Sequence, residues 1–323
     1  MGAAIVRSNG LVVMDVSGVR RRRRGGAVTV DERWHLGSNA KAMTATLVAL
    51  LVEEATDVDW ERSVADLFPD LEVDPAWREV TLQMLVDHRS GLASDLGTST
   101  MLASRAGLDP RAHRASWLEA TLASPPPETP GTFAYSNLGY IALGALLERR
   151  MDAPFEQLLR ERIWKPLGMH GCGFGGPGED NARGHVGGVA QGAYFDNPPI
   201  LAPAGTVHCT LESWAPFVTM HLRAARGEGD SHALLRPASF ERLHTAHDGG
   251  AYAGGWIVGE GDDGHPYLAH DGSNTAWLAR VIIVPALDAA LLIASNAGPL
   301  ESQGAIDAIT MSLLAHARDT PWP

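Results

Sequence analysis

The chain has few of the features that mark disulfide-rich, metal-binding or membrane proteins. It has two cysteines in 323 residues, Cys172 and Cys209, and their spacing forms no metal-ligand pattern. We therefore expect two reduced, unreactive thiols. The amino end, Met1 to Arg7, has neither the basic start and apolar stretch of a secretory signal nor a membrane-spanning run. These absences favour a cytoplasmic protein with no membrane partner.

Positive charge is also scarce. The formal net charge of −12 argues against a nucleic-acid partner and against binding to anionic membrane surfaces. The exception is the run of five arginines from Arg20 to Arg24, which Gly25 and Gly26 follow. A short charge run of this kind is typical of a solvated hairpin tip, and the alternative is a contact with an anionic partner or substrate tail.

No spacing in the sequence predicts a metal or another cofactor. His244 and His247 come nearest, but they lack the glutamate of a zinc motif and a clear third ligand, so we interpret them as surface histidines. A glycine-rich phosphate loop is also missing. We therefore expect neither a metal nor a cofactor.

What the chain does contain indicates one large α+β unit. Hydrophobic residues make up 45% and charged residues 20%, as in an ordinary globular protein with a sizeable core. Alternating and apolar runs predict strands near both chain ends, and helical periodicity predicts long helices at 38–54 and 302–318. The predicted strands are 3–7, 11–17, 27–30, 254–258, 265–269, 277–285 and 289–296. Together these elements predict an antiparallel sheet built from both ends and flanked by helices.

The division of this unit follows from the same pattern. Residues 1–57 and 227–323 would form the α/β sheet part, and residues 58–226 an inserted, mainly helical part. Because pockets commonly lie between such parts, we expect the site in the cleft between them.

Ser38 and Lys41 are the first candidate catalytic pair. They stand three residues apart at the start of a predicted helix, so they share a face. A serine hydroxyl becomes a good nucleophile when a neighbouring base takes its proton, and a partly desolvated lysine can be that base. Alone, the spacing is equally compatible with a solvated helix start that Ser38 caps.

Two later segments supply possible partners. Tyr135 and Asn137 lie in a loop between a Pro-Gly turn and an apolar helical run, where catalytic groups often occur. The segment from His270 through Gly272 to Ser273 falls between two strand-like runs. In isolation it is typical of a hairpin turn, although a glycine there would let a substrate approach the strand backbone.

Taken in this order, Ser-x-x-Lys, Tyr-x-Asn and His-x-Gly resemble the motifs of the serine β-lactamase-like superfamily, in its class C, esterase and D-aminopeptidase branch. The flanking sequence agrees with that pattern, for example at Leu36-Gly37-Ser38 and at His88-Arg89-Ser90-Gly91-Leu92. The resemblance covers nearly the whole chain and implies the same α+β fold.

The resemblance also implies roles for these residues. Ser38 would attack a carbonyl and form an acyl-enzyme, while Lys41 and Tyr135 would share the proton transfers, with either of them as the base. Asn137 would orient Lys41 and the substrate. The backbone N–H groups of Ser38 and Ser273 would form the oxyanion hole.

His270 departs from the pattern of the β-lactamases, which carry a lysine there. A histidine is mostly neutral at pH 7, so this substitution favours uncharged esters or amides over β-lactams. The sequence thus predicts a serine hydrolase acting on a small ester, amide or peptide. An acyltransferase or peptide-processing enzyme of a biosynthetic pathway and a non-catalytic scaffold remain as alternatives, and the sequence gives no indication of oligomeric state.

Overall fold

The computed structural model describes residues 1–228, 234–247 and 249–319. Its largest sheet has seven antiparallel strands in the order β10-β11-β12-β13-β14-β1-β2. Both chain ends contribute, as predicted. The strands are β1 (Gly2–Arg7), β2 (Gly10–Val16), β10 (Tyr252–Ala253), β11 (Trp256–Glu260), β12 (Pro266–Ser273), β13 (Leu278–Val284) and β14 (Ala289–Ser295).

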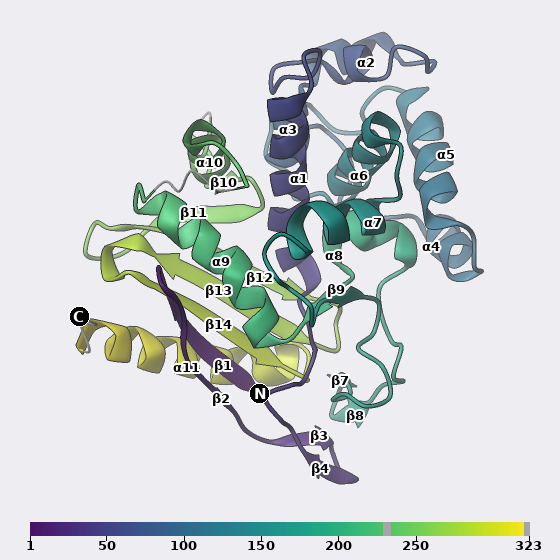
Figure 1. Ribbon diagram of the computed structural model, residues 1–323. Coiled ribbons are helices and arrows are strands. Elements are labelled where there is room, and N and C mark those ends of the chain that lie inside the picture. The colour runs from purple at the N-terminus through teal and green to yellow at the C-terminus, as the bar shows by residue number, and fades with distance from the viewer. Residues whose placement is uncertain (229–233, 248, 320–323) are drawn as a thin grey trace.

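Both faces of this sheet are covered, which explains why β14 is buried along its whole length. Successive strand residues point to opposite faces. Ile293 packs with Ile306 of α11 (Pro299–Asp319), whereas its neighbour Leu292 belongs to the main core. Helix α9 (Leu211–Ala225) packs against β1, β2 and β14. Figure 1 shows the sheet between α9 and α11.

A mainly helical region lies beside the sheet (Figure 1). Helix α1 (Ala40–Glu54) packs against α6 (Asn137–Met151) and α8 (Ala202–Gly205). Twelve of the fifteen residues of α1 are buried, as expected for a helix that is apolar on all sides. The remaining helices are α2 (Val64–Leu67), α3 (Leu82–Val86), α4 (Thr98–Arg105), α5 (Pro110–Leu122), α7 (Phe155–Leu159) and α10 (Pro237–His244).

Three small sheets complete the fold. The first joins β5 (Trp34–His35), β9 (Val207–Cys209) and β6 (Gly173–Phe174), and it leads directly into the turn that carries Ser38. The others are hairpins, β3 (Val19–Arg21) with β4 (Gly25–Ala27) and β7 (His185–Val186) with β8 (Val189–Ala190). No helix of the described residues is long and apolar enough to cross a bilayer.

The arginine run forms a hairpin tip, but the strand predicted at 27–30 is wrong. The second strand of that hairpin is Gly25–Ala27 instead. Gly25 and Gly26 both have positive φ, a conformation that glycine adopts without strain. The second strand of the hairpin therefore begins and ends earlier in the chain than the β-branched residues at 28–30 had suggested.

The two cysteines are paired, so the prediction of reduced thiols is wrong. Cys172 and Cys209 form a disulfide that links the loop before β6 to the end of β9. The cytoplasmic location therefore stays a prediction, and the cysteines no longer support it.

Reducing this disulfide should weaken the fold measurably. It closes a loop across a sequence separation of 37 residues, and chain-entropy reasoning for a loop of that size gives about 4 kcal/mol of stabilisation. We expect the free energy of unfolding, measured by urea denaturation, to fall by up to this amount when dithiothreitol is added. A double Cys172→Ala, Cys209→Ala variant should show no response to the reductant, and equal stability of oxidised and reduced wild type would contradict the prediction.

The histidines at 244 and 247 are also less exposed than predicted. His221 Nδ1 lies 2.8 Å from His244 Nε2, and burial lowers the pKa of His244 to about 3. His247 Nδ1 lies 3.0 Å from Asp87 Oδ2. Among the described residues, no group of three or more histidine, cysteine, aspartate or glutamate side chains could hold a metal.

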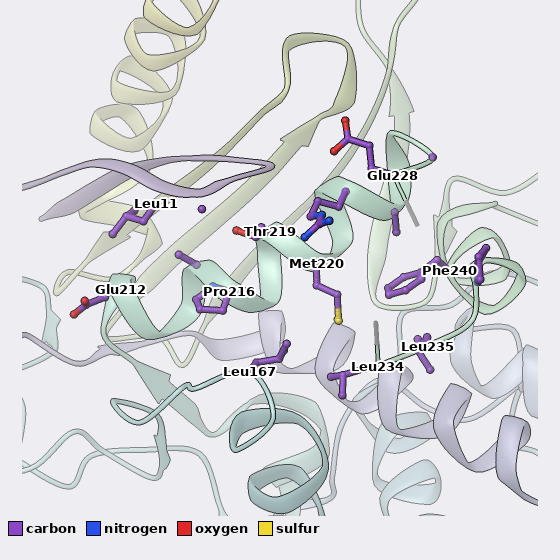
Figure 2. Close-up of a pocket in the computed structure, with 16 residues that line it drawn as sticks. Leu11, Leu167, Glu212, Pro216, Thr219, Met220, Glu228, Leu234, Leu235 and Phe240 are labelled. Carbon is purple, nitrogen blue, oxygen red and sulfur yellow. The ribbon is translucent and has the colours of Figure 1, made fainter. Parts of the chain in front are cut away.

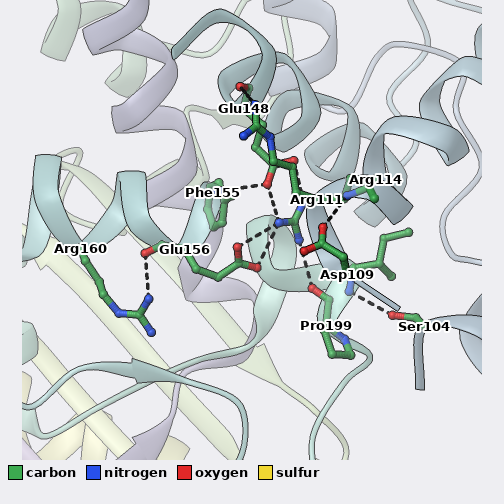
Figure 3. Close-up of polar contacts among 11 residues, drawn as sticks. Ser104, Asp109, Arg111, Arg114, Glu148, Phe155, Glu156, Arg160 and Pro199 are labelled. Carbon is green, nitrogen blue, oxygen red and sulfur yellow. Dashed lines mark hydrogen bonds and ion pairs between the residues drawn. The ribbon is translucent and has the colours of Figure 1, made fainter. Parts of the chain in front are cut away.

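A buried ion-pair network ties α5 to α6 and α7 (Figure 3). Arg114 has no exposed surface and donates to both carboxylate oxygens of Glu148, at 3.0 and 2.6 Å. It also donates to Glu156 at 3.0 and 3.1 Å and to the Pro199 carbonyl at 3.2 Å. Glu148 in turn accepts from the backbone N–H of Phe155.

Replacing Arg114 with methionine should strongly destabilise the protein. Removing Arg114 leaves the buried carboxylate of Glu148 without its ion-pair partner, which typically costs about 3–5 kcal/mol. The matched control is Arg111→Met, because Arg111 pairs with Asp152, whose side chain is 94% exposed. That surface pair should contribute at most about 1 kcal/mol. Urea denaturation measures both, and equal losses in the two variants would contradict the expectation.

Candidate active site

Ser38 lies in a tight turn that the chain enters from β5. Residues Gly37–Asn39 form a short 3-10 turn that continues into α1. Gly37 has φ +52°, which favours glycine. One turn later, Lys41 places its Nζ atom 3.1 Å from Ser38 Oγ. The structure therefore brings the first predicted pair into hydrogen-bonding contact.

Lys41 is fully buried and surrounded by neutral acceptors. Its Nζ atom lies 2.7 Å from Asn137 Oδ1 and 2.8 Å from the carbonyl oxygen of Ala204. Burial lowers the pKa of Lys41 to about 7, and the negative charge of Asp95 partly offsets that effect. A substantial fraction of Lys41 is therefore uncharged near neutral pH, as a lysine base must be.

Tyr135 and Asn137 reach the same place from the start of α6. Ser136 caps this helix by accepting from the N–H of Gly139 at 3.0 Å, which fixes the residues on either side of it. Lys41 Nζ lies 4.8 Å from the centre of the Tyr135 ring. Burial raises the pKa of Tyr135, although a hydrogen bond with the Ser38 side chain acts in the opposite direction. Tyr135 is therefore protonated at neutral pH.

The third predicted segment belongs to a strand rather than a turn. Residues from His270 to Ser273 form the end of β12 and pair with β13, with Ser273 opposite Leu278. The His270 ring is buried, its Nε2 atom lies 3.2 Å from the Tyr252 hydroxyl, and its Nδ1 atom lies 2.6 Å from the carbonyl oxygen of Asp271. Burial lowers the pKa of His270 to about 4, so the imidazole is neutral at pH 7.

Glycines let the end of β12 touch the Ser38 turn. A Cβ atom added to Gly272 would lie 2.0 Å from the carbonyl oxygen of Leu36 and 2.7 Å from the backbone nitrogen of Ser38. A Cβ atom on Gly37 would lie 2.2 Å from the backbone nitrogen of Ser273. Only glycine allows such close backbone contact. The backbone nitrogens of Ser38 and Ser273, predicted to form the oxyanion hole, therefore lie in directly adjoining segments.

Sequence reasoning missed several residues around this centre. Asp95 accepts from Asn137 Nδ2 at 2.6 Å and is exposed to solvent, and no role was predicted for it from the sequence. His88 and Tyr252 pack close to Tyr135, with the His88 and Tyr135 ring centres 4.3 Å apart. His88 was noticed only as part of a family pattern, and Tyr252 lies more than a hundred residues away, so no local signal pointed to them.

A separate cavity of about 660 Å³ lies between α9 and α10 (Figure 2). Its lining is mostly apolar and includes Met220, Leu235 and Phe240. Neither Ser38 nor Lys41 contributes to it. This cavity is therefore not where the Ser38 hydroxyl could meet a substrate.

A serine held against a buried lysine, beside the end of a strand of an antiparallel sheet, is an arrangement found in one class of serine hydrolases. The chain belongs to the Beta-lactamase family, whose family model matches residues 1–316. The predicted family and α+β fold are thereby confirmed.

Relatives in this family have several activities. The chain is 31% identical to penicillin-binding protein 4 of Amycolatopsis lactamdurans, an alignment that covers 87% of this chain and 77% of the relative. It is 26% identical to the unguisins hydrolase ungD' of Aspergillus campestris, over 83% of this chain but only 53% of the relative. It is also 29% identical to the esterase EstB of Burkholderia gladioli, over 53% of this chain and 46% of that enzyme.

Solved structures show the same fold at lower identity. SurE superimposes with a TM-score of 0.77 and 23% identity, covering 98% of this chain and 72% of SurE. The D-alanine carboxypeptidase AmpC of Burkholderia cenocepacia gives a TM-score of 0.72 and 20% identity, covering 94% of this chain and 90% of AmpC.

Proposed function

We propose that the protein is a serine hydrolase that forms an acyl-enzyme on Ser38 and cleaves a small, uncharged ester or amide. The observation that carries this proposal is the contact between Ser38 Oγ and Lys41 Nζ at 3.1 Å, together with a lysine pKa near 7. Membership of a family that includes esterases and other serine hydrolases supports it.

Acylation begins with attack of Ser38 Oγ on the substrate carbonyl carbon. As the new C–O bond forms, the Oγ proton passes to neutral Lys41. The negative charge that develops on the carbonyl oxygen is stabilised by the backbone N–H groups of Ser38 and Ser273. Asn137 holds Lys41 in line through its Oδ1 atom. Tyr135 does not act as the base, because its pKa is raised.

The leaving group departs with a proton. The hydroxyl of Tyr135 donates to the leaving oxygen or nitrogen as the carbonyl carbon releases it, and Lys41 returns its extra proton to Tyr135. Water then attacks the acyl-enzyme and loses a proton to Lys41. The bond between Ser38 Oγ and the acyl carbon then breaks, Lys41 gives its extra proton to Ser38 Oγ, and the acid product leaves.

The charges around Ser38 favour uncharged substrates. His270 is neutral at pH 7, so β12 offers no cation to a substrate carboxylate. The exposed carboxylate of Asp95, which is bonded to Asn137, would repel such a group. Esters and amides without a negative charge avoid both penalties.

Introducing a cation on β12 should shift the preference toward substrates that carry a carboxylate. We expect His270→Lys to raise the ratio of kcat/KM for a carboxylate-bearing ester over its uncharged methyl ester by about tenfold. That factor corresponds to about 1.4 kcal/mol, which one ion pair can supply in a partly desolvated site. His270→Gln is the control, since it changes the side chain without adding charge. A ratio that stays unchanged in the lysine variant would contradict the charge argument.

The proposed function is tested by pre-steady-state hydrolysis of p-nitrophenyl acetate with intact-mass analysis of the quenched protein. We expect a burst of p-nitrophenol and a single acetyl adduct that water removes. Adding amine or alcohol acceptors distinguishes hydrolysis from acyl transfer by whether the acetyl group ends on the acceptor. No adduct and no turnover with a series of uncharged esters and amides would overturn the proposal.

A further inference from the structure

A second buried pair lies directly behind the nucleophile turn. His35 of β5 has no exposed surface, and its Nε2 atom lies 2.5 Å from Asp196 Oδ1. Asp196 lies on the loop that precedes α8, 161 residues away along the chain. Neither residue touches Ser38 or Lys41 through its side chain, so the acylation steps described above do not use them.

The hydrogen bonds of His35 fix its protonation pattern. Its Nδ1 atom accepts from the backbone N–H of Gly37 at 3.1 Å. Because that nitrogen is an acceptor, the ring hydrogen lies on Nε2 and is donated to Asp196. The pair therefore anchors the residue immediately before the nucleophile, in the turn where Gly37 has positive φ.

The same carboxylate also reaches the other side of the oxyanion hole. Asn274 directly follows Ser273, is buried, and points its Nδ2 atom at Asp196 Oδ1 at 3.5 Å. Asn274 Oδ1 accepts from the N–H of Ala276 at 3.3 Å, which holds the asparagine in place. Arg105 donates to the backbone carbonyl of Asp196 at 3.0 Å and so fixes the loop that carries it.

One carboxylate oxygen thus connects the segment before Ser38 with the segment after Ser273. We propose that His35 and Asp196 are positioning residues that set the spacing and direction of the two oxyanion-hole N–H groups. This inference rests on the proposed function, since it assumes acyl chemistry at Ser38. Backbone donors must be aimed at the developing oxyanion before the reaction, and a misplacement of about 1 Å can cost about a hundredfold in rate.

Two variants of His35 separate its two hydrogen bonds. His35→Asn keeps an acceptor near the position of Nδ1 and loses the contact with Asp196. His35→Gln keeps a donor near the position of Nε2 and loses the acceptor for Gly37. We expect each to lower kcat for p-nitrophenyl acetate by about 10- to 100-fold with little change in KM. Asp196→Leu should do the same, and Asp196→Asn should recover much of the loss because it keeps an acceptor oxygen.

Three further measurements would distinguish positioning from a purely structural role: the amount of folded protein, the kcat of a control variant and the pH profile. Rates are normalised to folded protein by circular dichroism and thermal melting. The control is His208→Gln, because His208 lies opposite His35 in the β5–β9 pairing and is buried, but bonds to the carbonyl of Gly175. It should alter stability without lowering kcat. The acid limb of the pH profile should stay unchanged in the His35 variants, since Lys41 has no contact with His35.

The outcomes distinguish this inference from the proposed function. If wild type shows burst and turnover while folded His35→Asn, His35→Gln and Asp196→Leu keep kcat within twofold, the positioning role is overturned. A KM increase at constant kcat, or a loss of rate equal to that in His208→Gln, also overturns it. If wild type itself shows neither adduct nor turnover, the failure lies with the chemistry at Ser38.

Discussion

Ser38→Ala should abolish both covalent labelling and ester turnover. The substitution removes the Oγ atom that attacks the substrate carbonyl in the proposed mechanism, which lies 3.1 Å from Lys41 Nζ. Removing the nucleophile of a serine hydrolase typically costs about 10⁶ in kcat. We expect intact mass after incubation with a fluorophosphonate to show one adduct on wild type and none on the variant.

The matched control for this experiment is Ser273→Ala. Ser273 also has a hydroxyl near the site, where its Oγ atom accepts from the N–H of Thr275 at 2.9 Å. Its proposed catalytic contribution is a backbone N–H, which alanine retains. That variant should still be labelled, whereas labelling of Ser38→Ala at the wild-type stoichiometry would remove Ser38 from the nucleophile role.

The sequence predicted those parts of the site that depend on short-range geometry. Ser38 and Lys41 were expected to share a face because helical spacing places residues three apart together, and their side chains do meet. Most strands of the large sheet were also predicted, since their apolar runs match what a doubly covered sheet requires.

Features that depend on contacts between residues far apart in the sequence could not be predicted from local patterns. The segment ending at Ser273 has the composition of a turn, yet its pairing with β13 keeps it in the strand. The contact between His35 and Asp196 depends on how two loops meet, as does the disulfide between Cys172 and Cys209. No local propensity encodes such pairings, because tertiary packing overrides intrinsic preference.

Lys41→Met should lower the rate of acylation by about 10²- to 10⁴-fold, the usual contribution of a general base. Methionine nearly conserves the buried volume, so the loss reports on the missing amine rather than on a cavity. The measurement is the burst rate with p-nitrophenyl acetate. Tyr135→Phe is the comparison, because it keeps the ring but removes the hydroxyl. A mild effect in Lys41→Met with a severe one in Tyr135→Phe would move the base role to Tyr135.

The pH dependence tests the same assignment independently. Only neutral Lys41 can accept the Ser38 proton, so kcat/KM should rise as the pH increases through about 7, the pKa of Lys41, and level off above it. Asp95 raises that pKa through its negative charge. In Asp95→Asn the pKa of Lys41 should therefore fall, and the acid limb should move to lower pH. A limb that stays in place would show that a group other than Lys41 controls acylation.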